Sequence, residues 1–320
     1  MSDFGFESTA DEVLADKDLT GRTVFVTGGY SGLGQETARA MAAKGAHVII
    51  AGRDVTKLAA AGDEIAESTG GKVDTLKVDL ASLDSVRKAG EEARGRFDKI
   101  DILINNAGVM AAPKGTTADG FETQFGTNHL GHFMLTKELM PLVRKGSGQR
   151  IVNLSSRGHH LDRVHFDDPN FENRDYDPWL SYGQSKTANV LFAVGLEERF
   201  GSDGIHAYAL HPGGIQTNLG RHMSQEDMAN LRERARKNAE ANGQKPQPFK
   251  TVPQGAATTC WVATSQDLEG RGGLYAEDCQ VAEVDDQSRV GGVRSYAVDK
   301  AEAERLWALS EELVGERFEA

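Results

Sequence analysis

A glycine-rich turn between an apolar run and a helical pattern constrains this fold more than any other feature. The run Val24-Phe25-Val26 leads into Thr27-Gly-Gly-Tyr-Ser-Gly-Leu-Gly34, after which small and apolar residues recur with helical spacing. A strand, a glycine turn and a helix in that order predict a dinucleotide-binding unit, because the helix start offers free N–H groups to a phosphate. We therefore expect this turn to contact a cofactor through Gly28, Tyr30, Ser31, Gly32, Leu33 and Gly34.

Strands and helices alternate along the rest of the chain. Apolar runs predict strands at 23–27, 47–52, 73–78, 100–105, 150–154, 206–210 and 273–276. Helical patterns occupy 33–44, 57–68, 83–96, 120–144, 182–200 and 253–263, with Ser82 and Thr251 as candidate N-caps. This alternation predicts an α/β fold, a single Rossmann-type doubly wound parallel sheet with helices on both faces.

The fold is expected to occupy residues 19–320 as one domain, after an acidic N-terminal extension at 1–18 in which a short helix is expected at 11–15. The charged segment 218–250 predicts a substrate lid, with a helix at 226–237 and a hinge at 243–248. The segment 298–318 predicts a C-terminal helix, which could cover a surface used for assembly.

Charge and composition bear on partners and location. The 320 residues carry 36 Lys and Arg against 48 Asp and Glu, a formal net charge of −12, so no overall positive field attracts nucleic acid or an anionic membrane. No apolar stretch approaches the roughly 18 residues of a membrane span, and no signal pattern opens the chain. Cys260 and Cys279 provide no disulfide framework. We expect a soluble, cytoplasmic protein without a membrane anchor.

The end of the second predicted strand indicates which dinucleotide is bound. Gly52 stands where an acid would bond the ribose 2′-hydroxyl of NAD, and Arg53 follows where a guanidinium would accommodate the 2′-phosphate of NADP. We predict that NADP(H) is preferred and that NAD(H) is also usable. The alternative is that Arg53 is solvated and that Asp54 merely caps the next helix.

Tyr182 and Lys186 are spaced one helical turn apart and share a helix face. A neighbouring ammonium favours the phenolate, so we expect Lys186 to lower the pKa of Tyr182 and make the phenol a proton donor and acceptor near neutral pH. The same spacing occurs by chance in many solvated helices. The pair therefore indicates a proton-transfer site only in combination with the glycine turn upstream.

Together these residues resemble the short-chain dehydrogenase/reductase family over about residues 19–210. Further motifs match in order: Asp79 after a strand, then Asn105-Asn-Ala-Gly108, Asn128, Ser156, and His211-Pro-Gly213 followed by Thr217. A closer similarity, to the retinol-dehydrogenase-like branch that includes WW-domain oxidoreductases, rests on segments 154–159, 185–192 and 273–279.

The resemblance implies an oxidoreductase that interconverts a ketone or aldehyde and its alcohol by hydride transfer. It implies that Tyr182 exchanges the proton, that Ser156 rather than Ser155 holds the carbonyl oxygen, and that Lys186 bonds the nicotinamide ribose. Asn128 would hold a water that resupplies protons, although taken singly Ser156 could end a strand and Asn128 could bend or cap a helix. Further cofactor contacts are implied for Tyr182, Lys186, Asp79, Leu80, Asn106, Ala107, Gly108, Pro212, Gly213 and Thr217, and relatives often form dimers or tetramers.

Substrate identity is less constrained. The long connection between Ser156 and Tyr182 is rich in apolar and aromatic side chains, which predict either a pocket for a bulky, hydrophobic substrate or a loop folded into a satellite core. His159 or His160 is expected to face the substrate. The histidine pairs have no further ligand at a recognised spacing, so we expect no metal. Two alternatives stay open, an epimerase or dehydratase with tightly held NAD and a non-catalytic cofactor-sensing protein.

Overall fold

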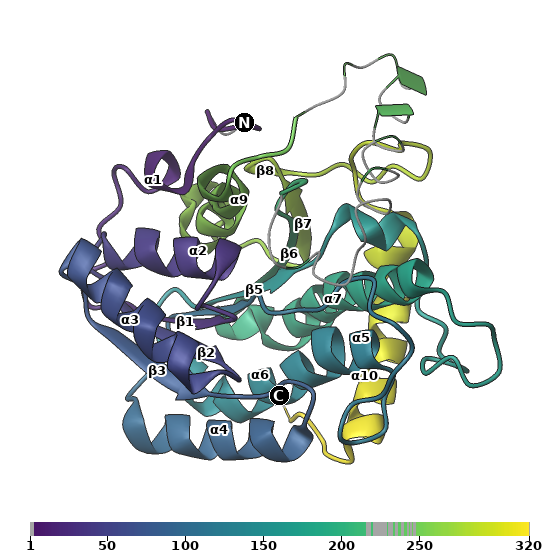
Figure 1. The fold of residues 1–320 in the computed structure, drawn as a ribbon, viewed down its shortest axis with the longest axis horizontal. Helices are drawn as coiled ribbons and strands as arrows, with labels where there is room; N and C mark the ends of the chain where they lie inside the picture. Colours follow the sequence, from purple (N-terminus) through teal and green to yellow (C-terminus); the bar gives the residue numbers. More distant parts are fainter. Residues whose placement is uncertain are drawn as a thin grey trace.

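The computed structural model describes residues 3–215, 219, 229, 233, 236–237, 240–241, 243, 245 and 248–319. One sheet with the strand order β3-β2-β1-β4-β5-β6-β7-β8 forms the centre of the molecule (Figure 1). Its strands are β1 (Thr23–Thr27), β2 (His47–Gly52), β3 (Val73–Lys77), β4 (Ile102–Asn105), β5 (Arg150–Leu154), β6 (His206–His211), β7 (Leu274–Glu277) and β8 (Gln280–Val281). All neighbouring strands are parallel except β8, which pairs antiparallel to β7. The predicted doubly wound α/β fold is confirmed.

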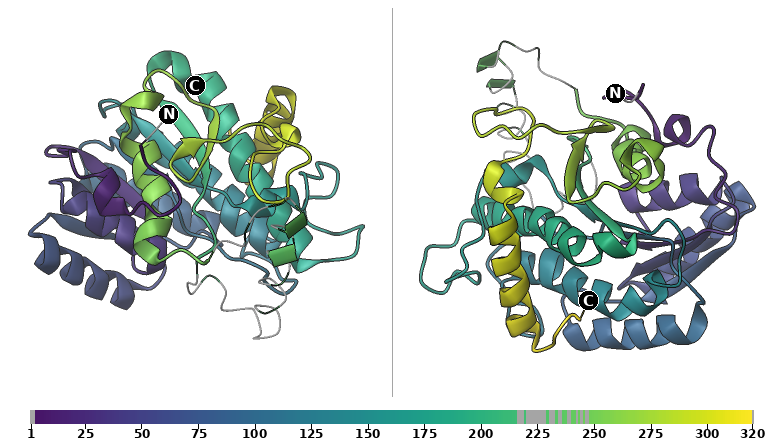
Figure 2. Two further views of the ribbon diagram at one scale, coloured as in Figure 1. Left: turned by 90° about the horizontal axis from the view of Figure 1, so that it is seen from above. Right: turned by 180° about the vertical axis from the view of Figure 1, so that it is seen from behind.

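Helices cover both faces of the sheet (Figures 1 and 2). One face carries α1 (Ala10–Val13), α2 (Gly32–Ala42), α3 (Val55–Thr69) and α9 (Val252–Thr264). The other carries α4 (Leu83–Arg96), α5 (Thr123–Phe125), α6 (Gly131–Val143), α7 (Pro178–Phe200) and α10 (Lys300–Val314). Because successive residues of a strand point to opposite faces, β1 sends Val24 and Val26 into the first apolar core and Phe25 into the second. Short turns of other helix types are η1 (Gly126–Leu130), η2 (Arg157–His160), η3 (Gly201–Asp203), η5 (Gln266–Leu268) and η6 (Ser295–Ala297).

Local chemistry accounts for several element boundaries. The side chains of Asp54, Ser82 and Thr251 each accept the backbone N–H three residues on and so begin α3, α4 and α9. Both predicted N-caps are confirmed. The long helix expected at 120–144 is confirmed as one continuous helical stretch from Thr123 to Val143, in which the π-helix η1 joins α5 to α6. Strand β8 was not predicted, since two residues carry no periodic signal.

The C-terminal helix α10 packs along α7 and closes one side of the molecule (Figure 2). Its Trp307 contacts Phe133 of α6 and Phe192 of α7, with ring centroids 5.1 and 5.9 Å away. Phe318 adds a further ring 4.9 Å from Trp307. The C-terminal segment therefore packs against both α6 and α7.

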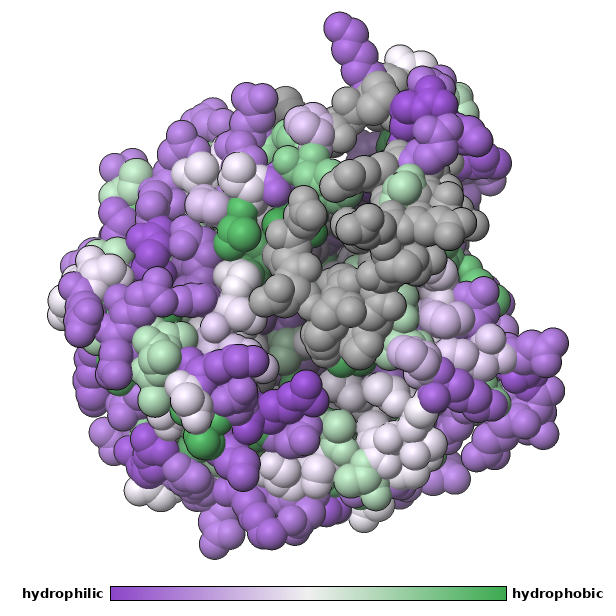
Figure 3. Space-filling view, viewed as in Figure 1, coloured by the Kyte–Doolittle hydropathy of each residue, from purple (hydrophilic) through white to green (hydrophobic). Residues whose placement is uncertain are grey.

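Two further expectations concern the lid segment and membrane-spanning helices. Most of the helix predicted at 226–237 and most of the lid at 218–250 lie outside the described residues. Across the described residues, no helix has both the length and the apolarity that a bilayer span requires. The face shown in Figure 3 is largely hydrophilic, and its apolar residues are scattered over it in small groups.

Candidate active site

A cavity of about 1560 Å³ opens at the carboxyl ends of the strands. It lies where β1 and β4 are neighbours and the strand order reverses, which is where open α/β sheets bind ligands. Its volume exceeds the roughly 300–1,000 Å³ of an ordinary ligand pocket. It has room for a dinucleotide together with a second molecule.

The glycine turn after β1 forms one wall of the cavity. Gly28 adopts a φ of +66°, a left-handed conformation that favours glycine. A Cβ on Gly34 would lie 2.5 Å from the Gly28 carbonyl oxygen, so the turn can close only around a glycine here. Ser31 begins α2 without a side-chain capping bond, so it does not occupy the first N–H groups of the helix. This arrangement fits the phosphates of a dinucleotide.

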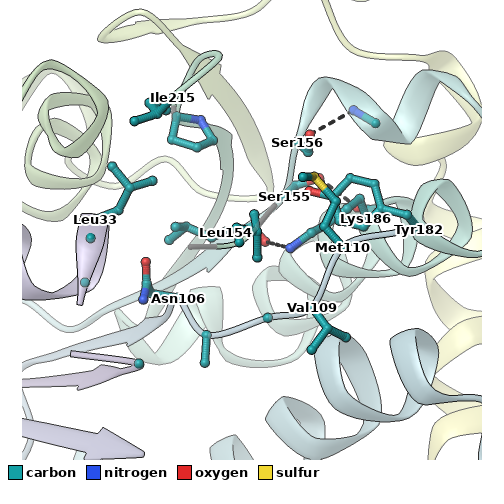
Figure 4. Close-up of a pocket in the computed structure, with 18 of the residues that line it drawn as sticks. Leu33, Asn106, Val109, Met110, Leu154, Ser155, Ser156, Tyr182, Lys186 and Ile215 are labelled. Carbon is teal, nitrogen blue, oxygen red and sulfur yellow. Dashed lines mark hydrogen bonds between the residues drawn. The ribbon is translucent and has the colours of Figure 1, made fainter. Parts of the chain in front are cut away.

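The loop after β4 is fixed against the end of β1. The Thr27 hydroxyl oxygen accepts the N–H groups of Asn106 and Ala107 at 2.9 and 3.0 Å. In return, the Asn106 side-chain amide donates to the Thr27 carbonyl at 2.7 Å. Asn106, Ala107 and Gly108 all line the cavity, and Figure 4 shows Leu33 and Asn106 on the side opposite Tyr182.

The end of β2 also lies at the cavity. The exposed side chain of Arg53 lines the cavity, as do Asp79 and Leu80 after β3. A Cβ on Gly52 would lie 2.4 Å from Cε1 of Tyr30, so the tyrosine ring occupies the space that an acidic side chain would need. Asp54 does cap α3, as the alternative interpretation held, but this leaves the Arg53 guanidinium in the cavity.

Ser156, Tyr182 and Lys186 meet on the other wall. Tyr182 and Lys186 lie on α7, each 4% exposed, and Ser156 follows β5 (Figure 4). The Lys186 Nζ donates to the Leu154 carbonyl at 3.0 Å and lies 5.6 Å from the centroid of the Tyr182 ring. The Ser156 hydroxyl accepts the N–H of Gly158 at 3.0 Å. Ser155 instead turns inward, where its hydroxyl donates to the Lys186 carbonyl at 2.7 Å.

The expected lowering of the pKa of Tyr182 is wrong, because burial shifts it in the opposite direction. Burial raises the pKa of Tyr182 to about 12, and the Ser156 hydroxyl opposes this only in part. Burial also lowers the pKa of Lys186 to about 8. Helical spacing predicts which groups are neighbours, but the loss of water around each group is the largest cause of both pKa shifts.

Asn128 lies in the π-helix η1 and is fully buried. Its side-chain amide donates to the Val109 carbonyl and to the Ser185 hydroxyl, both at 2.9 Å, and its Oδ1 accepts the Val109 N–H at 2.8 Å. The side chain thus joins the loop after β4 to α7. A Cβ on Gly108 would lie 3.0 Å from Asn128 Oδ1 and 3.6 Å from Lys186 Nζ, so this glycine lies between the two groups.

The prediction that His159 faces the substrate does not agree with the structure. Its side chain is 0% exposed, and both ring nitrogens lie within hydrogen-bonding distance of backbone atoms. His160 lines the cavity instead. Pro212 and Gly213 also line it after β6, whereas Thr217 lies outside the described residues.

Several cavity residues were not singled out from the sequence. A Cβ on Gly158 would lie 2.7 Å from Cε1 of Tyr182, so this glycine lets the phenol ring approach the turn after Ser156. A glycine two residues beyond the serine pair was an available signal for this contact. Met110, Arg157, Arg289 and Arg294 also line the cavity. The last two lie far along the chain, where no motif marks them.

Each of the two interpretations of the connection between Ser156 and Tyr182 holds for some of its residues. Leu161 and Trp179 line the cavity, whereas Val164 and Phe171 are buried in the protein interior. From the lid segment, the described residues Leu219, Glu233, Lys237 and Phe249 reach the cavity. The connection therefore supplies part of an apolar wall and part of a satellite core.

The histidines on η1 and α6 have partners other than a metal. His129 Nε2 lies 2.7 Å from the Ser310 hydroxyl, and His132 Nε2 lies 2.9 Å from the Thr27 hydroxyl. Burial lowers the pKa of His129 to about 3 and that of His132 to about 4, so both rings are neutral. Within the described part of the chain, no three His, Cys, Asp or Glu residues form a group that could hold a metal ion.

Comparisons with known proteins agree with this geometry. The family described as short chain dehydrogenase matches residues 22–228. A probable oxidoreductase of Streptomyces lividans is 45% identical over 91% of this chain and 96% of its own. Human retinol dehydrogenase 12 is 40% identical over 94% of this chain and 89% of its own.

A solved structure from Mycobacterium paratuberculosis superposes with a TM-score of 0.72 at 36% identity, covering 98% of this chain and 99% of that one. The likeness therefore spans the fold as well as the sequence. The glycine turn and the Tyr182 and Lys186 pair both fall within the matched family region. The chain belongs to the short-chain dehydrogenase/reductase family of oxidoreductases and resembles its retinol-dehydrogenase-like branch.

Proposed function

We propose that this chain is an NADP(H)-dependent oxidoreductase that interconverts a bulky, hydrophobic ketone or aldehyde and its alcohol. The observation that carries the proposal is that Ser156, Tyr182 and Lys186 face the glycine turn across one cavity. Membership of the family supports the reaction class. The exposed guanidinium of Arg53 in the cavity supports the choice of NADP(H).

Bound NADP(H) would supply or accept the hydride at the substrate carbon. When a carbonyl is reduced, negative charge grows on its oxygen, and donors already in place stabilise that charge. The Ser156 hydroxyl holds this oxygen and Tyr182 delivers the proton. Because the pKa of Tyr182 is raised to about 12, the phenol holds its proton at neutral pH and gives it up only as negative charge grows on the substrate oxygen.

In the reverse direction the phenol must first lose its proton. The ammonium of Lys186 is the nearby cation that stabilises the resulting phenolate. With a pKa of about 8, Lys186 is still mostly charged at neutral pH. Alcohol oxidation should therefore speed up as the pH rises, until Lys186 loses its charge.

A panel of carbonyl compounds tests the reaction. The purified chain should consume NADPH, followed by its absorbance, only when an aromatic, steroid or terpenoid ketone or aldehyde is present. Apolar wall residues such as Met110, Leu161 and Trp179 favour these over small ketones. Bound NADPH without turnover of any compound would contradict the proposal, and NAD retained through purification would favour an epimerase or dehydratase.

Arg53→Glu tests the cofactor preference. Because a guanidinium bonds a phosphate by charge-assisted hydrogen bonds, the substitution should weaken NADPH binding by about 10- to 100-fold. NADH, which has no 2′-phosphate, should lose far less affinity. Fluorescence titration of each nucleotide measures both effects.

Lys88→Glu on α4 is the matched control, because it makes the same change of charge at an exposed residue outside the cavity. It should leave both affinities nearly unchanged. Equal losses for NADPH and NADH in Arg53→Glu would show that Arg53 does not recognise the phosphate.

A further inference from the structure

The position of Ser156 depends on the short turn that follows it. Ser156 is extended, with φ −169° and ψ 158°, and it begins η2 by accepting the Gly158 N–H through its own hydroxyl. A movement of this turn would therefore move the hydroxyl. The turn lies directly against the Tyr182 ring, because Gly158 leaves no room for a Cβ there.

A distant part of the chain holds this turn in place. The segment 283–298, between β8 and α10, makes four hydrogen bonds to η2. The Arg157 guanidinium donates to the Val290 carbonyl at 2.7 Å, and His160 Nε2 donates to the Gly292 carbonyl at 2.9 Å. The remaining two reach His159 from Arg294 and Tyr296.

His159 lies at the centre of these contacts. Its Nδ1 is 2.7 Å from the Ser156 carbonyl oxygen, and its Nε2 is 3.2 Å from the backbone nitrogen of Arg294. A carbonyl oxygen only accepts and a backbone N–H only donates, so Nδ1 must carry the proton and Nε2 must be bare. The ring is also packed against Tyr275, with centroids 4.8 Å apart.

The surroundings keep the ring neutral. His159 is 0% exposed, and burial lowers the pKa of its imidazole to about 3. A second proton on Nε2 would face the N–H of Arg294 and break that hydrogen bond. His160 has the opposite arrangement, because its Nε2 faces a carbonyl and must donate.

We propose that His159 is a positioning residue, which in its neutral Nδ1–H form joins the Ser156 carbonyl to the backbone of Arg294 and thereby fixes the Ser156 hydroxyl beside Tyr182. This inference rests on the proposed function, because it assigns the C-terminal segment a part in the same reaction. The segment 283–298 thus acts on the site through Ser156 and not only as a wall of the cavity.

Two substitutions of His159 test its two ring nitrogens separately, because each keeps one hydrogen bond and loses the other. Asparagine places an amide nitrogen close to Nδ1, so His159→Asn keeps the bond to Ser156 and loses the one to Arg294. Glutamine places its amide near Nε2, so His159→Gln does the opposite. We expect His159→Gln to lower kcat by up to about 100-fold, the effect of a small misplacement of a catalytic group, with the KM for NADPH unchanged.

His159→Asn should retain kcat within about threefold of the wild type, since it preserves the contact to Ser156. Melting temperatures of both variants account for any loss of packing. In a Ser156→Ala background, His159→Gln should have little further effect on kcat. Equal losses in both variants, or a full additional loss in that background, would overturn the proposal.

Nitrogen NMR of the imidazole ring gives a readout that does not depend on turnover. The wild type at neutral pH should show Nδ1 protonated and Nε2 bare. A charged ring, or a proton on Nε2, overturns the proposal whatever the enzyme reduces. The assigned ring state together with no turnover of any carbonyl would instead contradict the proposed reaction.

Discussion

Tyr182→Phe is expected to lower kcat for carbonyl reduction by about 100- to 10,000-fold, the contribution usual for general acid–base catalysis. Phenylalanine keeps the ring that lies against Gly158 and Trp179 and removes only the hydroxyl. Ser156 and Lys186 would still face the cavity, but neither could replace the phenolic proton at that position. Single-turnover absorbance of NADPH measures the rate of the chemical step.

NADPH affinity and thermal stability are the controls for this variant. Both should stay close to the wild type, because the cofactor contacts of the glycine turn and the packing of the ring are retained. Trp179→Phe, a conservative change in the neighbouring wall, should alter KM for the carbonyl more than kcat. Activity of Tyr182→Phe within threefold of the wild type would remove Tyr182 from the reaction.

Lys186→Met is expected to abolish most turnover and yet stabilise the fold. The Lys186 ammonium is buried, which lowers its pKa from 10.5 to about 8. Replacing it by an apolar chain of similar length removes that desolvation penalty, on the order of 3 kcal/mol at neutral pH. The Leu154 carbonyl would not be left without a donor, because the Asn189 amide also donates to it at 2.9 Å.

The pH dependence of unfolding checks the cause. Between the folded pKa of about 8 and the ordinary value of 10.5, the unfolded chain binds more protons at Lys186 than the folded chain. The penalty in the wild type is therefore full below pH 8 and fades as the pH rises towards 10.5. Urea unfolding should show a large advantage of Lys186→Met at pH 7 and little at pH 10. An equal advantage at both pH values would point to packing as the cause.

Much of the sheet could be predicted from the sequence, because buried parallel strands consist of continuous apolar runs. The bounds predicted for β1, β2 and β5 agree with the structure. The π-helix η1 was missed, since it is a short segment inside a continuous helix and none of the residue patterns considered distinguishes it from an α-helix. Asn128 lies in this π-helix.

The sequence predicted which residues lie together at the site, but it did not predict how burial changes the pKa values of their side chains. The spacing of Tyr182 and Lys186 placed both on one helix, but it could not predict that both side chains are buried away from water. His159 shows the same limit, because a histidine after a serine pair looks the same in sequence whether it faces a substrate or the interior. Its partner Arg294 comes from a segment more than a hundred residues away, joined only by the fold.

The contact between Tyr30 and Gly52 links two positions that are separate in sequence. A side chain at 52 would overlap the phenol ring, with its Cβ 2.4 Å from Cε1. A carboxylate introduced there to suit an unphosphorylated ribose would displace the ring before it could reach the ribose. A carboxylate at position 52 is therefore expected to reach a ribose only when Tyr30 is also replaced by a smaller side chain.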